Sequence, residues 1–423
     1  MKKNILILGS GGREYAFTWK LFNEKNVNNI YCIPGNAGTA SIANNVNISI
    51  NDFKSIVDFV KDKNIDFTIV GPEDPLDNGI VDYFKAHNCK ILGPNKDCAK
   101  LESSKIYARD IMKKYNIPHP NYVSCKTKEE VISAQNKLGF PIVLKADGLA
   151  AGKGVIICND QKEFSRGLSN FFENNNFGKA SNKISVEECI SGPEISIFTI
   201  CDGDEYIILN NAQDHKRIYD GDIGPNTGGM GAYCPTPLYD KFLESKIKEK
   251  IIEPTLNAMI SEGHPYSGFL YFGLMLVKNE PYIIEYNVRM GDPETQVVLP
   301  MMDTSLSDLV NSTINHKLKT FDYKNKSGSC VTVVLAADGY PGDYKKGYKI
   351  EGLNKLNKNL VFHAGTSLDD KNNFITSGGR ILNVLGYGKN LNDAIKDVYE
   401  NVEKVNFKNK YFRKDIAKKG LNY

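Results

Sequence analysis

Residues 4–14, with the sequence Asn4-Ile5-Leu6-Ile7-Leu8-Gly9-Ser10-Gly11-Gly12-Arg13-Glu14, decide the fold of the first part of the chain. Four consecutive apolar residues that end in glycine are typical of a short strand buried on both faces. The glycines then turn the chain into a helical pattern that continues to Phe22. A buried strand, a glycine turn and a helix form the first half of a βαβ unit, which predicts a parallel sheet.

Three further apolar runs before residue 100 repeat this rhythm. They cover residues 30–33, 67–70 and 91–92, a glycine follows each run within two residues, and a second helical pattern covers residues 53–62. Ligands of such sheets gather at the carboxyl ends of the strands, where these glycine loops fall. Residues 1–100 are therefore predicted to form an N-terminal doubly wound domain that binds part of a substrate.

The loop of Gly11, Gly12 and Arg13 is a candidate anion site. Glycine lets the backbone approach a ligand closely, and the start of a helix offers free N–H groups to a phosphate. The alternative is a tight turn without a ligand. A nicotinamide dinucleotide is disfavoured, because Glu14 replaces the last glycine of the G-x-G-x-x-G fingerprint and the second strand ends in Pro34-Gly35 instead of an acidic residue.

Length and composition narrow the class of protein. A chain of 423 residues exceeds the size of one hydrophobic core, so several domains are expected. The net charge of +3 gives no reason to expect a nucleic-acid or membrane partner. Nine scattered cysteines without a C-x-x-C pair, and a longest apolar run of residues 268–277 that stops at Lys278, favour a soluble cytoplasmic protein.

Residues 121–184 predict a small lid domain. Two apolar strands, at residues 141–145 and 155–157, flank the glycine-rich loop of residues 148–154. The loop is not a Walker A motif, because its glycine spacing is too short and a strand follows it instead of a helix. A hairpin that closes over phosphates fits this pattern, and an ordinary glycine-rich hairpin with two solvated lysines is the alternative.

The rest of the chain divides into two units. A helical pattern opened by residues 101–105 ends at Pro118, and residues 101–120 with 185–325 are predicted to form a central domain. A new apolar run begins at Cys330, so residues 326–423 are predicted to form a small C-terminal α/β domain. The fold class expected is therefore a multidomain chain of mixed α/β and α+β type.

The stretch from Tyr282 to Arg289 carries the clearest chemical pattern. In a strand its side chains alternate, which places Glu285, Asn287 and Arg289 on one face, opposite Ile284, Tyr286 and Val288. Carboxylate and amide oxygens suit a hard cation such as Mg²⁺ that shares the phosphates of a nucleotide. The alternative is an edge strand whose polar residues face solvent.

Two polar, glycine-rich segments are predicted to be strand-free substrate loops. They cover residues 213–217 and 224–231, and flexible charged loops are the alternative. His215 is expected to be a surface or salt-bridged histidine. The strand end at residues 186–190 could bind an adenine and its ribose through Glu188 or a neighbour, with Glu194 near the same edge.

Taken together, several motifs closely resemble the phosphoribosylamine–glycine ligase (glycinamide ribonucleotide synthetase) family of the ATP-grasp superfamily. The resemblance extends over the whole chain, with Tyr15 and Ser103 as departures from the family pattern. It implies an ATP-grasp module, made of the lid and the central domain, between the N-terminal and C-terminal domains. The motifs cover residues 9–14, 34–39, 145–154, 213–217, 224–233 and 289–296.

The resemblance also implies roles for individual residues. Mg²⁺ or Mn²⁺ would bind to Glu285 and Asn287, and the catalytic side chains would be Arg289, Asp292 and Lys153. The residues that contact ATP would be Lys105, Lys145, Gly152, Lys153, Gly154, Glu187, Glu188, Ile190 and Glu194. The residues that contact the other substrates would be Gly11, Gly12, Arg13, Asn36, Gly38, Thr39, Asp214, Lys216, Asn226, Thr227, Gly228, Gly229, Met230, Gly231 and Arg289.

The implied reaction joins glycine to 5-phosphoribosylamine at the expense of ATP. The glycine carboxylate would attack the γ-phosphoryl group to give glycyl phosphate, and the ribosyl amine would then displace phosphate in this step of purine biosynthesis. A monomer with small-molecule partners is expected. Three rivals stay open: another ATP-grasp activity such as a carboxylation, an oxidoreductase, and a nucleotide sensor without catalysis.

Overall fold

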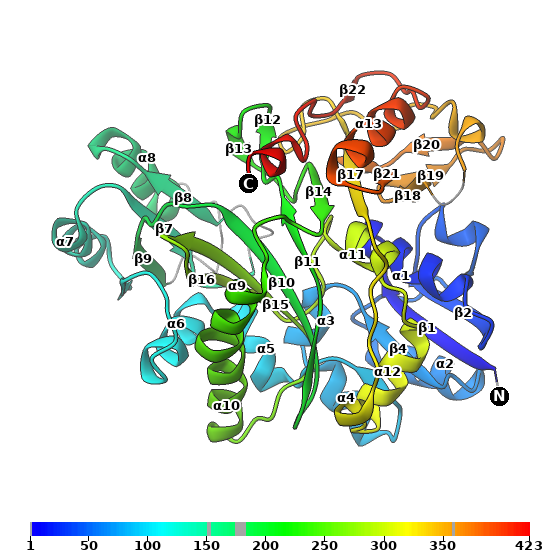
Figure 1. Cartoon of the computed structure of the whole chain (residues 1–423), viewed down its shortest axis with the longest axis horizontal. Coiled ribbons are helices and arrows are strands. Elements are labelled where there is room, and N and C mark those ends of the chain that lie inside the picture. Colours follow the sequence, from blue (N-terminus) through cyan, green and yellow to red (C-terminus); the bar gives the residue numbers. More distant parts are fainter. Residues whose placement is uncertain (1, 150–153, 174–182, 358–359) are drawn as a thin grey trace.

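The computed structural model describes residues 2–149, 154–173, 183–357 and 360–423. Three larger sheets organise the molecule, and helices cover them. Figure 1 shows the four-stranded sheet with helices α7 and α8 at one end and the N-terminal sheet with β1 and β2 at the other, with the longest strands between them. This mixed α/β architecture of several units confirms the predicted fold class.

The N-terminal sheet is parallel throughout and has the strand order β3-β2-β1-β4-β5. Its central strand β1 is buried from Ile5 to Gly9, as the apolar run predicted. Side chains of this unit and of the central strands share one hydrophobic core, in which Leu6 and Ile33 pack with Ile195 and Phe272. The elements are β1 (Lys3–Gly9), α1 (Gly12–Phe22), β2 (Val27–Pro34), β3 (Asn44–Asn45), α2 (Phe53–Asp62), β4 (Phe67–Val70), α3 (Glu73–Asp77), α4 (Ile80–Ala86) and β5 (Ile91–Leu92).

The helical pattern after residue 100 is interrupted at Ser104. Helix α5 (Lys96–Ser103) ends there and α6 (Lys105–Lys114) begins, because Ser104 has an extended backbone and caps α6 by accepting a hydrogen bond from the Tyr107 amide. The Ser104 hydroxyl and the Ile106 amide both donate to Asp147, at 2.9 and 3.1 Å. The lid is therefore tied to the start of α6.

The lid sheet has the strand order β6-β9-β7-β8 and a hydrophobic core of its own. Strands β7 and β8 form the predicted antiparallel hairpin, with Lys145 opposite Val155. The tip of its loop, including Gly152 and Lys153, lies outside the described residues. The elements are β6 (Tyr122–Cys125), α7 (Lys128–Leu138), β7 (Ile142–Ala146), β8 (Val155–Cys158), α8 (Gln161–Phe172) and β9 (Ile184–Glu188).

The largest sheet runs β16-β15-β10-β11-β14-β17-β21-β18, with β22 paired to β17. Its first five strands belong to the segment before residue 326 and the others to the segment after it, and the two halves join where β14 pairs with β17. The domain limits inferred from the sequence stay a prediction. The strands are β10 (Glu194–Asp202), β11 (Tyr206–Asp214), β14 (Gly231–Cys234), β15 (Ser267–Val277), β16 (Glu280–Asn287), β17 (Ser329–Ala337), β18 (Val361–His363), β21 (Arg380–Gly388) and β22 (Lys410–Tyr411).

Two small hairpins and several helices complete the chain. Within the parts that the structure describes, no helix combines the length and apolar character that a bilayer crossing requires. The hairpins are β12 (Arg217–Tyr219) with β13 (Ile223–Asn226), and β19 (Thr366–Leu368) with β20 (Phe374–Thr376). The helices are α9 (Lys241–Ile247), α10 (Glu253–Ser261), α11 (Thr295–Met301), α12 (Leu306–Ile314), α13 (Leu391–Val402) and a 3₁₀-helix at Lys418–Asn422.

Candidate active site

A cavity of about 680 Å³ lies where the lid, the central strands, the N-terminal sheet and the C-terminal segment meet. The face predicted from strand alternation points into it, because Glu285, Asn287 and Arg289 all line the cavity. Strand β16 supplies the first two, and Arg289 follows directly after its end. The cavity thus gathers a carboxylate, an amide and a guanidinium on one wall.

Glu285 is ionised on this wall. Burial would raise its pKa, but the charges of Lys216, Lys105 and Lys145 lower the pKa to about 2. The nearest of them, Lys216 Nζ, lies 3.1 Å from Glu285 Oε1 and 3.3 Å from Glu194 Oε2. The Asn287 amide is satisfied when its nitrogen faces Glu102 Oε1 at 3.0 Å. An ionised carboxylate beside an amide is a donor set that suits Mg²⁺ or Mn²⁺.

A bulge in β16 moves Ile284 to the cavity side. The register with β15 shifts between Gly273 and Leu274, so that Ile283 and Glu285 are paired and Ile284 is not. Ile284 therefore lines the cavity, and the prediction that it lies opposite Glu285 is wrong. Its carbonyl oxygen accepts hydrogen bonds from Lys145 Nζ at 3.0 Å and from Arg109 at 2.9 Å.

Glu187 joins these two cations. Its carboxylate receives two hydrogen bonds from Arg109, at 3.0 and 2.7 Å, and lies 2.9 Å from Lys145 Nζ. Burial raises the pKa of Glu187, but the two cations overcome this effect and lower the pKa to about 2. Glu187 is 1% exposed and both its oxygens are engaged, whereas Glu188 is exposed and contacts Asn121. The structure gives Glu187 the role of holding Lys145 in place.

Arg289 is held between two glutamates that strand alternation did not reveal. Its guanidinium lies 2.8 Å from Glu102 Oε1 and 3.3 Å from Glu73 Oε2. Glu102 also accepts a hydrogen bond from the Val288 amide at 2.7 Å. Glu73 begins α3 at the end of β4, and Glu102 lies in α5, so the N-terminal half of the chain sets the direction of this arginine.

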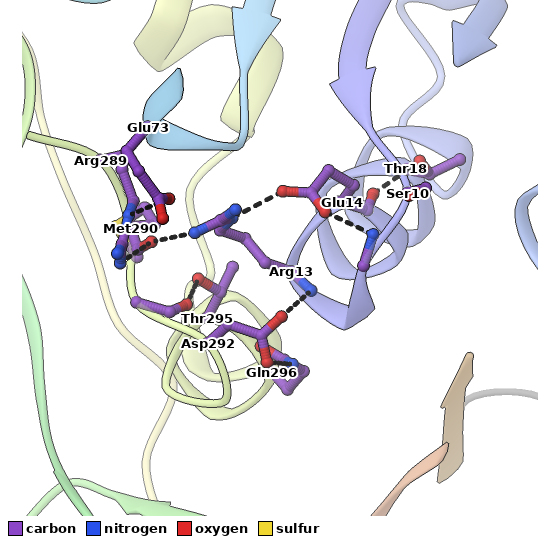
Figure 2. Close-up of polar contacts among 12 residues, drawn as sticks. Ser10, Arg13, Glu14, Thr18, Glu73, Arg289, Met290, Asp292, Thr295 and Gln296 are labelled. Carbon is purple, nitrogen blue, oxygen red and sulfur yellow. Dashed lines mark hydrogen bonds and ion pairs between the residues drawn. The ribbon is translucent and has the colours of Figure 1, made fainter. Parts of the chain in front are cut away.

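The start of α1 faces another part of the chain, as Figure 2 shows for Arg13 and Asp292. The Arg13 amide at the start of α1 donates to Asp292 Oδ2 at 3.2 Å, so a carboxylate of the protein takes the place expected for a phosphate. Arg13 pairs with Glu14 at 2.6 Å and donates to the Met290 carbonyl, as Figure 2 shows. Of these residues, Arg13 and Asp292 line the cavity, whereas Gly11 and Gly12 are not part of its described wall.

The loop of Asn36, Gly38 and Thr39, which was predicted to contact a substrate, packs against the C-terminal segment. The Asn36 side chain donates to the carbonyls of Ser10 and His363, and its oxygen accepts from the Thr39 amide. A Cβ added to Gly38 would lie 2.3 Å from that of His363. The structure therefore places Asn36, Gly38 and Thr39 away from the described cavity wall, in a contact between the two ends of the chain.

The segment of residues 213–231 is not strand-free, and that prediction is wrong. Gln213 and Asp214 end β11, residues 217–226 form the β12–β13 hairpin, and Gly231 begins β14. Short strands separated by glycines carry too little apolar pattern to be recognised alone. Of the predicted substrate residues here, five line the cavity: Asp214, Lys216, Asn226, Thr227 and Gly228.

Gly229, Met230 and Gly231 support this segment from behind. A Cβ on Gly229, which has a φ of +111°, would lie 2.3 Å from Pro293, and one on Gly231 would lie 2.6 Å from the Thr332 carbonyl. Met230 is fully buried. Arg380 of β21 holds the segment at Gly228, because its Nη1 donates to the carbonyls of Gly228 at 2.6 Å and Asp292 at 2.8 Å.

Two buried acids of the cavity wall, Glu294 and Asp214, have raised pKa values. Burial and the nearby Asp214 raise the pKa of Glu294 to about 8, and burial also raises the pKa of Asp214. His215 between Asp214 and Lys216 is buried, and its Nε2 accepts a hydrogen bond from the Ala417 amide at 3.2 Å. The expectation of a surface or salt-bridged histidine is wrong, and burial lowers the pKa of His215 well below its usual range.

Most residues predicted to contact ATP line the same cavity. Lys105 contacts the Glu102 carbonyl at 3.2 Å, and Asp292 lies 3.1 Å from Arg380. Sequence reasoning missed Glu102, Arg109, Arg380 and Lys419, whereas Glu73 lies in the glycine loop after residues 67–70, which was expected to face a ligand. The predicted residues on the cavity wall, besides those named above, are Lys145, Gly154, Glu187, Glu188, Ile190 and Glu194.

Comparisons with known proteins agree over the whole chain. Family profiles of phosphoribosylglycinamide synthetase match residues 3–102 (N domain), 103–295 (ATP-grasp domain) and 330–419 (C domain). The phosphoribosylamine–glycine ligase of Caldanaerobacter subterraneus is 42% identical over 98% of this chain and 99% of its own length. That of Clostridium acetobutylicum is 43% identical with the same coverage.

A solved structure has the same architecture. The crystal structure of phosphoribosylamine–glycine ligase from Thermotoga maritima superposes with a TM-score of 0.84 at 35% identity, and covers 97% of this chain and 99% of that one. With three family profiles and relatives above 40% identity over nearly the full length, the chain belongs to the phosphoribosylamine–glycine ligase family of ATP-grasp enzymes.

Proposed function

We propose that this chain is an ATP-dependent ligase that joins glycine to 5-phosphoribosylamine and releases ADP and phosphate, through glycyl phosphate, in purine biosynthesis. The observation that carries the proposal is the cavity wall of Glu285, Asn287 and Arg289 in a chain of this family. We further propose that the protein acts as a cytoplasmic monomer, without a nucleic-acid or membrane partner.

The nucleotide end of the cavity lies between the lid and β16. We assign ATP to Lys105, Lys145, Gly154, Glu188, Ile190 and Glu194, and extend the assignment to Gly152 and Lys153 at the lid tip. Glu285 and Asn287 fit Mg²⁺ or Mn²⁺, because one is ionised and the other offers an amide oxygen. When bound, such an ion would neutralise charge on the phosphates. Glu187 keeps Lys145 directed at the cavity through the contact described above.

The chemistry needs positioning and charge neutralisation more than a protein nucleophile. Arg289, fixed by Glu73 and Glu102, would stabilise the phosphoryl group during attack by the glycine carboxylate. Asp292 and Lys153 are proposed as further catalytic groups. Water would hydrolyse the acyl phosphate, so a lid that covers the cavity protects the intermediate.

The opposite wall fits the amino substrates. Asp214 and Glu194 flank Lys216, and their negative charge suits the amino groups of glycine and the ribosyl amine. The loop of Asn226, Thr227 and Gly228 would hold the substrates in place. Gly229, Met230 and Gly231 would support that loop, and Gly11, Gly12, Asn36, Gly38 and Thr39 would support the wall from the N-terminal domain.

ADP release measured with freshly generated phosphoribosylamine tests the proposal. We expect release only when ATP, glycine and phosphoribosylamine are all present, with glycinamide ribonucleotide formed in equal amount. Release that ignores glycine, or that requires bicarbonate, would instead favour another ATP-grasp activity and refute this one.

A further inference from the structure

The phosphate ester of phosphoribosylamine needs positive charge, and the two N-terminal loops predicted to contact substrates, at residues 11–13 and 36–39, pack against other parts of the chain. Gly12 lies against Asn383 and Gln296, and Asn36 against His363. A phosphate monoester carries nearly two negative charges at neutral pH, so the cations of the cavity are the candidates to bind it. This question rests on the proposed function, since it concerns one of its substrates.

Most cations of the cavity are already neutralised by carboxylates. Arg13, Lys145, Lys216, Arg289 and Arg380 each lie within 3.1 Å of a carboxylate oxygen. A guanidinium or ammonium group paired in this way contributes less to binding a second anion. The remaining cations of the described cavity wall are therefore the better candidates to bind a phosphate.

Three cations of the cavity have no carboxylate oxygen within hydrogen-bond distance in the described part of the chain. Lys105 Nζ contacts only the Glu102 carbonyl, and its charge lowers the pKa of Glu285, which places it at the nucleotide end. Arg217 donates to the Gly224 carbonyl at 2.7 Å. Lys419 donates to the Asp214 carbonyl at 3.1 Å, and its nearest carboxylate oxygen, on Asp222, is 3.6 Å away.

The buried Arg413 contacts the backbone of Arg217 and is connected to Lys419 through Asp222. The Arg413 side chain is 1% exposed, donates to the Arg217 carbonyl at 2.9 Å and lies 2.7 Å from Asp222. Asp222 is shared, because Arg413 pairs with its Oδ1 while its Oδ2 lies 3.6 Å from Lys419 Nζ, a longer contact than those of the neutralised cations. The Ala417 amide fixes the same segment to His215. Arg217, which pairs with Asn226 in the β12–β13 hairpin, and Lys419 thus come from distant parts of the chain, line the same cavity and are each held by contacts with the protein.

We propose that Arg217 and Lys419 form the binding site for the phosphate ester of phosphoribosylamine. The site takes a sugar phosphate dianion, with Lys419 supplied by the 3₁₀-helix at Lys418–Asn422. Its place beside Asp214 lets the sugar bridge from the phosphate to the acidic wall that receives the amine. The C-terminal segment therefore binds substrate in addition to forming part of the cavity wall.

The experiment compares Lys419→Met, Arg217→Met and Lys419→Arg with the control Lys418→Met. Lys418 is an exposed neighbour in the same short helix and is not part of the described cavity wall. Steady-state kinetics give KM for phosphoribosylamine, glycine and ATP. Titration calorimetry on the full chain gives the affinity for ribose 5-phosphate, with ribose as the uncharged probe.

Loss of one charged contact should raise KM for phosphoribosylamine about 10- to 100-fold and weaken ribose 5-phosphate to the same extent. KM for glycine and ATP, and the weak affinity for ribose, should stay within about twofold, as should all constants of Lys418→Met. Lys419→Arg should restore most of the affinity, because it restores the charge.

Two results would overturn this site. Ribose 5-phosphate affinity that is unchanged in both methionine variants would show that the phosphate binds elsewhere, and so would a rise in KM for glycine or ATP alone. The two proposals fail separately: a wild-type chain that binds ribose 5-phosphate through these residues but releases no ADP with both substrates contradicts the ligase function and leaves the anion site standing.

Discussion

Replacing Glu187 by glutamine removes a single charge and should lower the free energy of unfolding strongly. The side chains of Glu187 and Arg109 are 1% and 3% exposed, and that of Lys145 is 11% exposed. Without the carboxylate, the charges of two buried cations lose the anion between them, and Arg109 and Lys145 keep their neutral contacts with the Ile283 and Ile284 carbonyls and with Met112 Sδ. Removing one partner of a buried ion pair typically costs about 3–5 kcal/mol.

The pKa of Glu187 leads to a similar magnitude. Its folded pKa of about 2 lies below the ordinary value of 4.5, which corresponds to roughly 3 kcal/mol of stability from the ionised form. A depressed pKa means that this stability is complete above pH 4.5 and is lost as the pH falls towards 2. The difference between wild type and Glu187→Gln should therefore be constant near pH 7 and shrink below about pH 4.5.

Urea unfolding followed by circular dichroism measures this difference. The matched control is Glu188→Gln, which changes the neighbouring exposed residue and should alter the free energy of unfolding by no more than about 0.5 kcal/mol. If Glu187→Gln costs less than about 1 kcal/mol at pH 7, or no more than its control, the buried pair does not hold the lid to β16. A difference that grows in acid would contradict the sign of the argument.

Three other changes test other parts of the site. Glu285→Ala should lower kcat at millimolar Mg²⁺ by at least about 100-fold with an unchanged circular dichroism spectrum, and full activity would show that the metal wall lies elsewhere. Gly12→Ala would place a Cβ 2.4 Å from Asn383 Nδ2 and should cost about 1–3 kcal/mol by thermal unfolding, whereas an unchanged melting temperature would show that this contact has room. The folded pKa of Glu294 is about 8, so wild type should lose stability relative to Glu294→Gln as the pH rises from about 4.5 to 8. Above pH 8 the difference should stay constant. A difference in the free energy of unfolding that does not depend on pH would refute the raised pKa.

Local patterns were sufficient to predict the N-terminal sheet and the shared cavity face of Glu285, Asn287 and Arg289. Apolar runs that end in glycine marked β1, β2, β4 and β5 because a strand buried on both faces needs no alternation. Alternation along β16 placed Glu285, Asn287 and Arg289 on one wall because it depends only on the pleat of a strand. The family resemblance supplied the reaction, which no local pattern contains.

The errors concern features that depend on distant partners. The bulge that exposes Ile284 exists only in the pairing of β16 with β15, and the burial of Asn36 depends on His363, 327 positions away. Lys419 carries no motif, because its importance comes from what surrounds it in space. Sequence reasoning also took the N-terminal end of α1 to be free, whereas Asp292 occupies it.

That contact has a consequence for the order in which the chain assembles. Asp292 follows Arg13 by 279 positions, so the carboxylate that caps α1 is synthesised long after the helix. At about 5–20 residues per second, the ribosome needs roughly 15–60 s to reach it. During that time the nascent N-terminal sheet must persist with the positive end of α1 exposed. The Arg13 amide receives its acceptor only when the segment after β16, which carries Asp292, has been synthesised.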